Sequence, residues 1–273
     1  RPKDGELRNF HGIISVFKQG EEAQFDHYCY KAVLVPRLWC MSLSRQNQIH
    51  QEKRVPDIVK DEILHGDFCG GILADDIDNR MAEDYPVREY TVQYRESDLD
   101  FISRLMEHEG IYYYFDHVDG HDKLVFCDEK SKLDEVLVEN TVSYVPKSGL
   151  ASFDDQAIHS FNSTQTQICK EIILKDYNYR TPHLPMEGNA ETGDLGYGRK
   201  YAYGDHFKDV IQGNKLAQRR AQMERCQEHT CTGTSDALFF QAGKLIQVED
   251  HYRGSLNGEY LITRIRHMGG QAL

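Results

Sequence analysis

One stretch constrains the fold more than any other: QYRESDLDFISRLMEHEGIYYYF, residues 93–115. Ser97 and Asp100 have the spacing of a capping box, which satisfies backbone N–H groups at the start of a helix. The apolar residues that follow recur every three or four positions and predict one buried helix face: Leu99, Phe101, Ile102, Leu105 and Met106. Gly110 can adopt the left-handed conformation that ends a helix. The stretch therefore predicts a capped helix between two strands.

Strand-like alternation flanks this helix on both sides. In REYTVQYR (88–95), Tyr90, Val92 and Tyr94 alternate with polar residues, which predicts a half-buried strand with these three residues on its apolar side. After the helix, two short apolar segments are predicted to pair as a hairpin through HVDGHD; they are residues 111–116 and 123–129.

Glu107 and Glu109 break a local rule, because acids in the last turn of a helix oppose the helix dipole. Nothing nearby in the sequence compensates for them, so we expect an Arg or Lys partner across a domain or subunit boundary. A catalytic use is disfavoured. EHEG lacks the two-histidine zinc pattern, and residues two positions apart point about 200° apart on a helix, away from any shared substrate.

Two more helices are predicted. VPDIVKDEILHG (55–66) has Pro56 near its start and Gly66 at its end, and its inner face would carry Ile58, Val59, Ile63 and, as the weak member, Glu62. QGNKLAQRRAQMERCQE (212–228) is helical in composition, and its apolar side would carry Leu216, Ala217, Ala221 and Met223.

The rest of the chain is rich in strand-forming residues. Its 16 Tyr and 12 Phe favour strands over a helical bundle. FHGIISVF and YCYKAVLVPRLWCMSLS, within residues 10–45, are apolar or alternating, and a second β-rich region begins near residue 157. We therefore divide the chain into a β-rich segment 1–55, a mixed α+β segment 56–156, and a β-rich segment 157–273 that contains one helix.

Charge and composition disfavour several classes of protein. The 44 acidic and 32 basic residues give a formal net charge of −12, so we expect no nucleic-acid partner. No apolar run approaches the roughly 18 residues of a membrane span. The opening RPKDGELRNF is charged, shows no signal peptide and lacks an initial Met, so we expect the chain to start inside a longer protein. The seven Cys form no CxxC pair, which indicates free thiols rather than a disulfide framework.

Several residues resemble pieces of catalytic or metal sites. Cys226, His229 and Cys231 could bind zinc with His206 as a fourth ligand, but their spacing is irregular for structural zinc, and free thiols with a surface His are the favoured interpretation. Asp250 and His251 are adjacent, but the chain has no G-x-S-x-G nucleophile motif. His267 stands alone on a predicted strand. We therefore predict no catalytic residue and no metal site.

GDLGYGRKYAYG (193–204) contains the glycines of a phosphate-binding loop without its pattern. No Walker or GxGxxG spacing occurs there, and no strand leads into a helix. A tyrosine-rich turn is the favoured interpretation. Carbohydrate binding by these aromatic residues would rest on tyrosine abundance alone.

Six segments occur in an order that resembles one protein family: VPDIVKDEIL, REYTVQYRESDLDFISRLMEHEGIYYYF, KDYNYRTP, YAYGDHF, LAQRRAQ and FFQAGKLIQVEDHYRGSLNGEYLITRIRHMGG. Together they look like the hub region of VgrG, the spike protein of bacterial type VI secretion, which is similar to the baseplate hub of contractile-tailed phages. The resemblance covers nearly the whole chain, and residues 87–115 are its most specific part.

The resemblance implies a mainly β fold with α+β insertions, in which two β-barrels similar to the tube protein Hcp are linked by smaller α+β domains. Residues 1–55 would form the first barrel, incomplete at its N-terminus. Residues 56–156 would form the intervening region, and residues 157–273 the second barrel with its helical segment. The resemblance implies no enzyme activity and no cofactor.

In function, the resemblance implies a homotrimer that caps the hexameric Hcp tube, contacts baseplate components and carries the puncturing needle and secreted effectors. Such a protein is made in the bacterial cytoplasm without a signal peptide. The type VI machine then secretes it to the extracellular space or into a target cell. One alternative is a phage or phage-like tail baseplate hub with the same mechanics. An alternative of a different class is a cell-envelope hydrolase that uses Asp250, His251 or the Glu107–Glu109 region.

Overall fold

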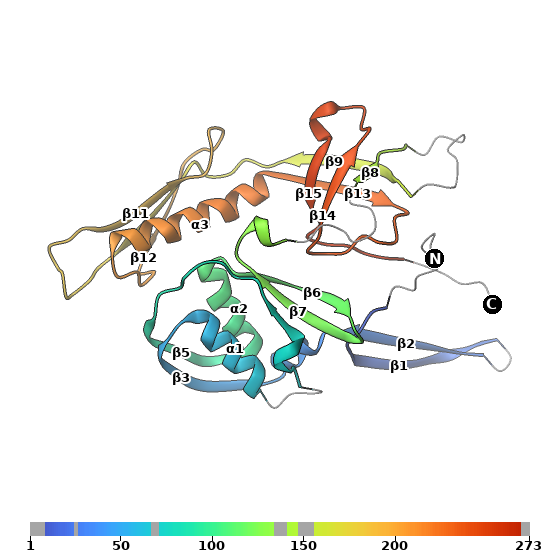
Figure 1. Ribbon diagram of the computed structural model, residues 1–273, viewed down its shortest axis with the longest axis horizontal. Helices are drawn as coiled ribbons and strands as arrows, with labels where there is room; N and C mark the ends of the chain where they lie inside the picture. The colour runs from blue at the N-terminus through green and yellow to red at the C-terminus, as the bar shows by residue number, and fades with distance from the viewer. Residues whose placement is uncertain (1–8, 25–26, 67–70, 134–140, 147–155, 269–273) are drawn as a thin grey trace. The chain divides into compact units, whose positions relative to one another are not determined.

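The computed structural model describes residues 9–24, 27–66, 71–133, 141–146 and 156–268 (Figure 1). The chain divides into two compact units. Unit 1 comprises Arg1–Val138, Leu238–Leu245 and Leu261–Leu273, and unit 2 comprises Glu139–Ala237 and Ile246–Tyr260. This grouping differs from the three predicted segments, because strands on either side of residue 55 pair with each other and two late segments belong to unit 1.

Unit 1 begins with a hairpin of β1 (Ile13–Gln24) and β2 (His27–Val35), which pair antiparallel. Branched and aromatic residues favour both strands. Pro36 follows β2 and precedes a 3-10 helix over Arg37–Ser42, as expected of a residue that cannot donate to a strand ladder. Among the described residues, β1 and β2 form a sheet of their own.

A second antiparallel pair carries the two helices of unit 1. It consists of β3 (Arg45–Lys53) and β5 (Arg88–Ser97). Each strand leads directly into a helix, β3 into α1 (Val55–His65) and β5 into α2 (Asp98–Glu109). The two helices lie side by side against this sheet in Figure 1.

The predicted boundaries of α2 are confirmed. The Ser97 hydroxyl accepts from the Asp100 backbone N–H at 3.1 Å, and Gly110 ends the helix with φ of 75°. Four of the five predicted stripe residues are buried, and Leu99 is partly buried. The prediction for α1 is also confirmed, including burial of Glu62 on its inner face.

The hairpin predicted after α2 is confirmed as β6 (Tyr112–Val118) and β7 (His121–Cys127). Asp119 and Gly120 between these strands both have positive φ, at 52° and 81°, which matches the twist of antiparallel strands. The short strand β4 (Ile77–Asn79) pairs parallel with β7. The helices, β7 and the 3-10 helix at Arg37–Ser42 enclose one apolar core, which includes Leu38, Met41, Ile58, Ile63, Phe101, Ile102, Leu105, Met106 and Leu124.

The predicted orientation of β5 is wrong. Tyr90 and Tyr94 are 55% and 63% exposed, whereas Thr91 and Gln93 face the helices and are buried. Alternation identifies two faces of a strand but does not show which one is covered. Gln93 Nε2 donates to the Asp98 carboxylate at 2.7 Å, which offsets part of the cost of burying this polar face. Gln93 Oε1 and Thr91 Oγ1 are buried without a hydrogen-bond partner among the described residues.

Unit 2 contains three small sheets. In the first, β10 (Glu171–Asp176) lies between β11 (Met186–Glu191) and β12 (Arg199–Tyr203). The second pairs β9 (Ile158–Gln165) with β13 (His229–Ser235). The third orders three short strands, β15 (Gly258–Leu261), β14 (Leu245–Glu249) and β8 (Thr141–Ser143).

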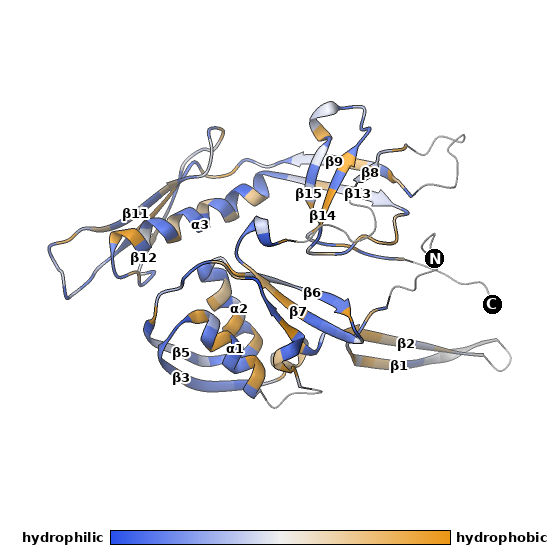
Figure 2. Ribbon diagram, viewed as in Figure 1, coloured by the Kyte–Doolittle hydropathy of each residue, from blue (hydrophilic) through white to orange (hydrophobic). Residues whose placement is uncertain are grey.

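Helix α3 (Val210–Glu228) packs on β10 and β11, and the Asp209 side chain caps it by accepting from Gln212 N–H at 2.8 Å. Its buried side carries Leu216, Ala217 and Ala221, as predicted. Met223, predicted on the same side, is 43% exposed. The hydropathy colouring of Figure 2 shows hydrophilic residues along much of this helix.

Both units are mainly β with packed helices, but every sheet formed by the described residues has two or three strands. The two closed barrels therefore stay a prediction. No helix within the described ranges is long and apolar enough to cross a membrane.

Close packing of α3 on β11 depends on two glycines. A Cβ on Gly188 would lie 2.2 Å from the backbone carbonyl carbon of Gly213, and backbone atoms cannot rotate away. We expect Gly188→Ala to lower the free energy of unfolding by about 1–3 kcal/mol, as overpacking does. Denaturant unfolding followed by circular dichroism measures this. Gly254→Ala is the control, because its Cβ would meet nothing within 4 Å; equal losses in both variants would contradict the packing argument.

Candidate functional site

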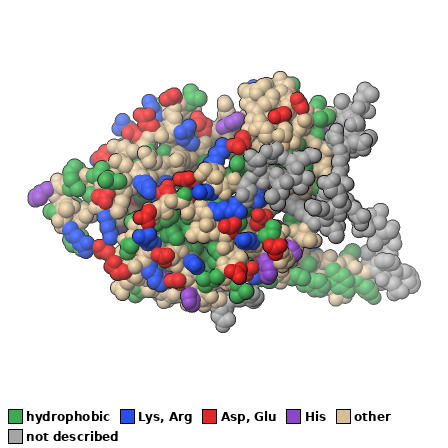
Figure 3. All heavy atoms as spheres, in the orientation of Figure 1, with side chains coloured by type: hydrophobic (Ala, Val, Ile, Leu, Met, Phe, Trp, Pro, Cys, Tyr) green, Lys and Arg blue, Asp and Glu red, His purple; other side chains and the backbone are tan. Residues whose placement is uncertain are grey.

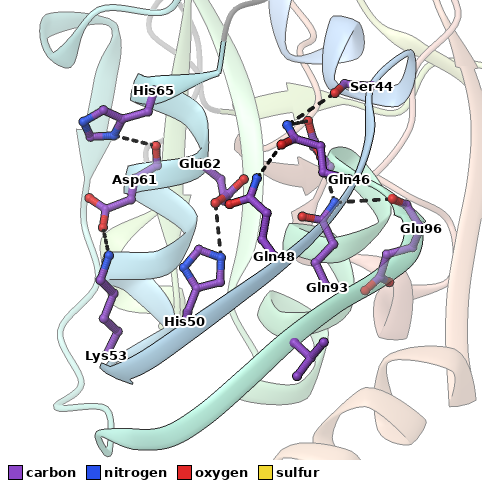
Figure 4. Close-up of polar contacts among 12 residues, drawn as sticks. Ser44, Gln46, Gln48, His50, Lys53, Asp61, Glu62, His65, Gln93 and Glu96 are labelled. Atoms are coloured by element: carbon purple, nitrogen blue, oxygen red, sulfur yellow. Dashed lines mark hydrogen bonds and ion pairs between the residues drawn. The ribbon is translucent and has the colours of Figure 1, made fainter.

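One group of polar contacts in unit 1 joins β3 to α1 (Figure 4). His50 Nε2 lies 3.2 Å from a Glu62 carboxylate oxygen, and the two side chains are only 7% and 9% exposed. Nearer the surface, Lys53 Nζ lies 2.7 Å from the Asp61 carboxylate. These pairs join the strand to the helix that follows it.

Burial controls the chemistry of the inner pair. It lowers the pKa of His50, with the nearby Lys53 adding to the effect. It raises the pKa of Glu62, and the neighbouring carboxylates of Asp98 and Asp61 raise it further. Both shifts favour uncharged side chains. The His50 ring also stacks on Phe101 with centroids 5.5 Å apart. A His–Glu pair could transfer protons, but this one is enclosed by its own unit, so its role is structural.

Glu109, singled out in the sequence, is buried at the C-terminal end of α2. Its carboxylate accepts from Arg88 Nη2 at 2.6 Å, and His108 Nδ1 lies 3.6 Å away. Burial alone would raise the pKa of Glu109, but the hydrogen bonds from His108 and Arg88 lower it to about 2. Arg88 belongs to the same unit, so Glu109 finds a cation without crossing a boundary. Glu107 is exposed, and for it the contact across a boundary stays a prediction.

The residues considered for zinc do not assemble into a metal centre in the part of the chain that the structure describes, where no three potential ligands group together. His229 Nε2 lies 2.8 Å from the Ser163 hydroxyl and 3.8 Å from Cys231 Sγ. Burial raises the pKa of the Cys231 thiol, which disfavours the thiolate that a metal needs. Cys226 and His206 are exposed.

His251 is a packing residue. Its ring is 5% exposed, and Tyr144 and Tyr252 lie against it with centroid distances of 4.4 Å each. Its Nδ1 accepts from the Arg253 backbone N–H at 3.0 Å, which fixes a turn. Asp250 is exposed with φ of 60°. His267 Nε2 lies 3.1 Å from the Phe240 carbonyl oxygen. The ring contacts and the turn hydrogen bond give His251 a structural role, so no catalytic role is needed to explain why Asp250 and His251 are adjacent.

The segment 193–204 contains β12 rather than a phosphate-binding turn before a helix. Tyr197, Tyr201 and Tyr203 are exposed there. The Arg199 guanidinium pairs with Glu171 across the parallel strands at 2.9 Å. The segment therefore serves as a sheet edge with aromatic side chains facing solvent.

Two exposed apolar surfaces of unit 1 were missed by sequence reasoning. We call the first the hairpin face; it consists of Ile14, Phe17, Tyr28, Tyr30 and Leu34, all between 48% and 65% exposed. Figure 3 shows hydrophobic side chains gathered along this hairpin. We call the second the sheet face; it is the outer side of β3–β5 and consists of the exposed Ile49, Tyr90 and Tyr94 with the partly exposed Val92. The sequence shows the alternation of apolar and polar residues in both segments, but it does not show that the apolar side faces outward.

Comparison with known proteins points to one family. Residues 1–273 match the family model of the phage tail baseplate hub (GPD). The type VI secretion system spike protein VgrG4b of Pseudomonas aeruginosa is 31% identical over 265 residues, which are 96% of this chain and 32% of that protein. The actin cross-linking toxin VgrG1 of Vibrio cholerae is 30% identical over 273 residues, which are 97% of this chain and 24% of that protein. The chain thus spans about a quarter to a third of these relatives.

Solved structures show the same fold. The Escherichia coli c3393 protein, described as a type VI secretion component with structural similarity to the T4 phage tail proteins gp27 and gp5, aligns with a TM-score of 0.65 and 23% identity. The alignment covers 94% of this chain and 55% of that chain. A tail protein from Neisseria meningitidis aligns with a TM-score of 0.60 at 12% identity, covering 92% of this chain and 72% of that one.

The ion pair at Glu109 yields a first prediction for this site. Arg88→Gln removes the arginine that binds the buried Glu109 carboxylate. We expect the free energy of unfolding at pH 7 to fall by about 2–3 kcal/mol. This is near the low end for a broken buried pair, because Arg88 is partly exposed. Because the folded pKa is depressed, this contribution is present above about pH 4.5 and disappears as the pH falls toward 2. Denaturant unfolding at pH 7 and pH 3 measures both effects.

The control for this prediction is Arg54→Gln. Arg54 makes an ion pair of the same 2.6 Å length with Asp84, but both groups are well exposed. We expect a change below about 1 kcal/mol there. A loss at Arg54 as large as at Arg88 would refute the assignment of the effect to burial.

Glu62 should respond in the opposite direction to Glu109. Since the folded pKa of Glu62 is raised, its ionised form costs stability, and this cost grows as the pH rises through the folded pKa. We expect Glu62→Gln to be neutral or stabilising by on the order of 1 kcal/mol at pH 8, whereas Glu109→Gln destabilises. Thermal unfolding of both variants from pH 5 to pH 8 tests the contrast, and a destabilised Glu62→Gln at pH 8 contradicts it.

Proposed function

The chain belongs to the phage tail baseplate hub (GPD) family, and we propose that it is the hub part of a type VI secretion spike. The observation that carries this proposal is the family match over residues 1–273, together with type VI spike proteins that align with 95–96% of the chain. The solved structures support the fold, because both a type VI component and a phage tail protein share it.

In this proposal the chain acts as a homotrimer. Two barrels resembling the tube protein would be contributed by each copy, so that three copies present six and match the hexameric Hcp tube. The hub would cap that tube, contact baseplate components and carry the needle and effectors. The protein would be made in the bacterial cytoplasm and leave the cell through the machine.

A phage or phage-like tail hub is the second candidate, because tail proteins share the fold. The sequence identity to the type VI spike protein VgrG4b, 31% over 265 residues, favours secretion. The hydrolase candidate is weaker, since His251 is enclosed by aromatic rings and Glu109 is held by Arg88. The cross-linking activity in the name of the Vibrio cholerae relative does not transfer, because this chain spans 24% of that protein.

A mass measurement tests the homotrimer. We expect the chain at high concentration to have three times its monomer mass of 31.6 kDa by size exclusion with light scattering. A chain that stays monomeric at every concentration would count against the hub assembly. The matching control is the mass in denaturant, where one copy is expected.

A secretion assay separates the hub from the hydrolase. We expect Asp250→Asn, which keeps a residue tolerant of positive φ, to leave release of the tube protein into the medium unchanged, within about twofold. Truncation of the chain should abolish release. Selective loss of release or of target-cell killing in Asp250→Asn, with unchanged stability and mass, would support the hydrolase instead.

A further inference from the structure

The turn that joins β14 to β15 is supported from inside by one buried histidine. His251 comes just after β14 and is only 5% exposed. Its backbone N–H donates to the side-chain oxygen of Asn257 at 2.9 Å, which ties the two ends of the turn together. Between these ends, the backbone N–H of Arg253 donates to His251 Nδ1 at 3.0 Å. The conformation of residues 250–257 therefore depends on this ring.

The hydrogen bond from Arg253 decides which ring nitrogen carries the proton. Because Nδ1 accepts an N–H, the uncharged ring has its proton on Nε2. Nε2 is buried and has no hydrogen-bond partner among the described residues. Nδ1 also lies 3.3 Å from the Arg253 carbonyl oxygen, which already accepts from the Leu256 N–H at 2.9 Å. The closed turn thus suits an uncharged His251 and offers a protonated ring one distant acceptor.

Aromatic rings surround this histidine. Tyr144 and Tyr252 lie against it with ring centroids 4.4 Å away in both cases, and Phe161 of β9 meets it edge-on at 6.1 Å. The polar contacts of its ring nitrogens among the described residues are those to Arg253. Tyrosine hydroxyls carry no charge between pH 5 and pH 8. A positive charge on the ring would therefore be buried without a carboxylate to pair with it.

The charged groups near the turn lie outside this aromatic enclosure. On the segment of His251 itself, Glu249, Asp250 and Arg253 are exposed. On β9, His159 lies two residues before Phe161 and 3.1 Å from the carboxylate of Asp236. Histidines gain a proton in mild acid, so His159 is the neighbour whose titration has to be separated from that of His251.

We propose that His251 is an acid-sensitive latch: the uncharged ring holds turn 250–257 closed, and protonation of Nδ1 by solvent opens it. Once Nδ1 carries a proton, it can no longer accept from Arg253, and two N–H groups point at each other. The stacked tyrosines offset part of the buried charge, but the open turn lets water hydrate both ring N–H groups. Opening exposes the rings of Tyr144 and Phe161, so acid changes the surface of unit 2 at this turn.

The direction of the pH response follows from proton linkage. Since the closed turn favours the uncharged ring, the open turn binds one more proton, and a lower pH favours opening. Hydrogen exchange of the backbone amides in peptide 250–257, measured by mass spectrometry and corrected for the intrinsic rate at each pH, reports the opening. Because one proton changes the opening equilibrium by up to about tenfold per pH unit, we expect protection to fall at least tenfold from about pH 7.5 to about pH 5. The amides of β10 should keep their protection, and unchanged protection of the turn would overturn the latch.

Three variants assign the response to one ring nitrogen. His251→Asn places a side-chain oxygen where Nδ1 lies, so the Arg253 N–H keeps an acceptor that does not titrate, and we expect a protected turn at both pH values. His251→Phe keeps a ring between the tyrosines but removes the acceptor, so protection should be low at both. The control is His159→Asn, which keeps a donor for the Val145 carbonyl and should respond to pH like the unaltered chain. A response that persists in His251→Asn, or disappears in His159→Asn, would refute the assignment to His251.

A measurement on the unaltered chain decides the case in which a variant fails to fold. The ¹⁵N chemical shifts of the His251 ring, observed after labelling of the histidines, report its tautomer and its protonation. We expect the Nε2–H tautomer at about pH 7.5, and we expect protonation to accompany the loss of protection in peptide 250–257. A ring with its proton on Nδ1 at that pH, or a ring that titrates while the turn stays protected, would overturn the proposal.

Discussion

The helix α2 is fastened to strand β5 at both of its ends, and the core of unit 1 depends on this. At the start, Ser97 ends the strand and caps the helix, and Gln93 on the same strand donates to Asp98. At the end, Arg88 at the beginning of β5 binds Glu109. The two contacts set the helix antiparallel to the strand and fix its rotation. Its apolar stripe can then face only the core.

The position of an acid decides whether it stabilises this arrangement. Glu109 stands where the helix dipole disfavours it and is buried, yet Arg88 and His108 stabilise its charged carboxylate and lower its pKa to about 2. Glu62 is buried to a similar degree with a histidine whose pKa burial lowers. Glu109 on α2 therefore stabilises the fold through its ion pair, whereas ionised Glu62 on α1 destabilises it. Neither carboxylate is available to a substrate.

Local rules predicted the elements well, because caps, turns and stops act within a few residues. The Ser97 cap, the Gly110 stop and the Asp119–Gly120 turn are all of this kind. The direction in which β5 faces was predicted wrongly, since alternation does not show which side the helices cover. Thr91 pairs with His50, which lies 41 residues earlier on β3 and stacks on Phe101 of α2. The partner of Glu109 lies 21 residues earlier on another element, so no rule about helix ends could have named it. Recognition of the family came from long matching segments instead.

A sheet that turns polar side chains inward and tyrosines outward is informative about assembly. Burying Thr91 and Gln93 does not stabilise the unit by itself, because the Gln93–Asp98 hydrogen bond replaces one to water, and Thr91 Oγ1 and Gln93 Oε1 are buried without a partner among the described residues. Exposing Tyr90, Tyr94 and Ile49 forgoes about 25 cal/mol for each Å² of apolar area left in water. Within the unit, the inner face is held by the Gln93–Asp98 hydrogen bond and by the stacking of His50 on Phe101. Exposed apolar patches mark interaction surfaces in many proteins, so the outer side of β3–β5 is a place where a contact would add stability.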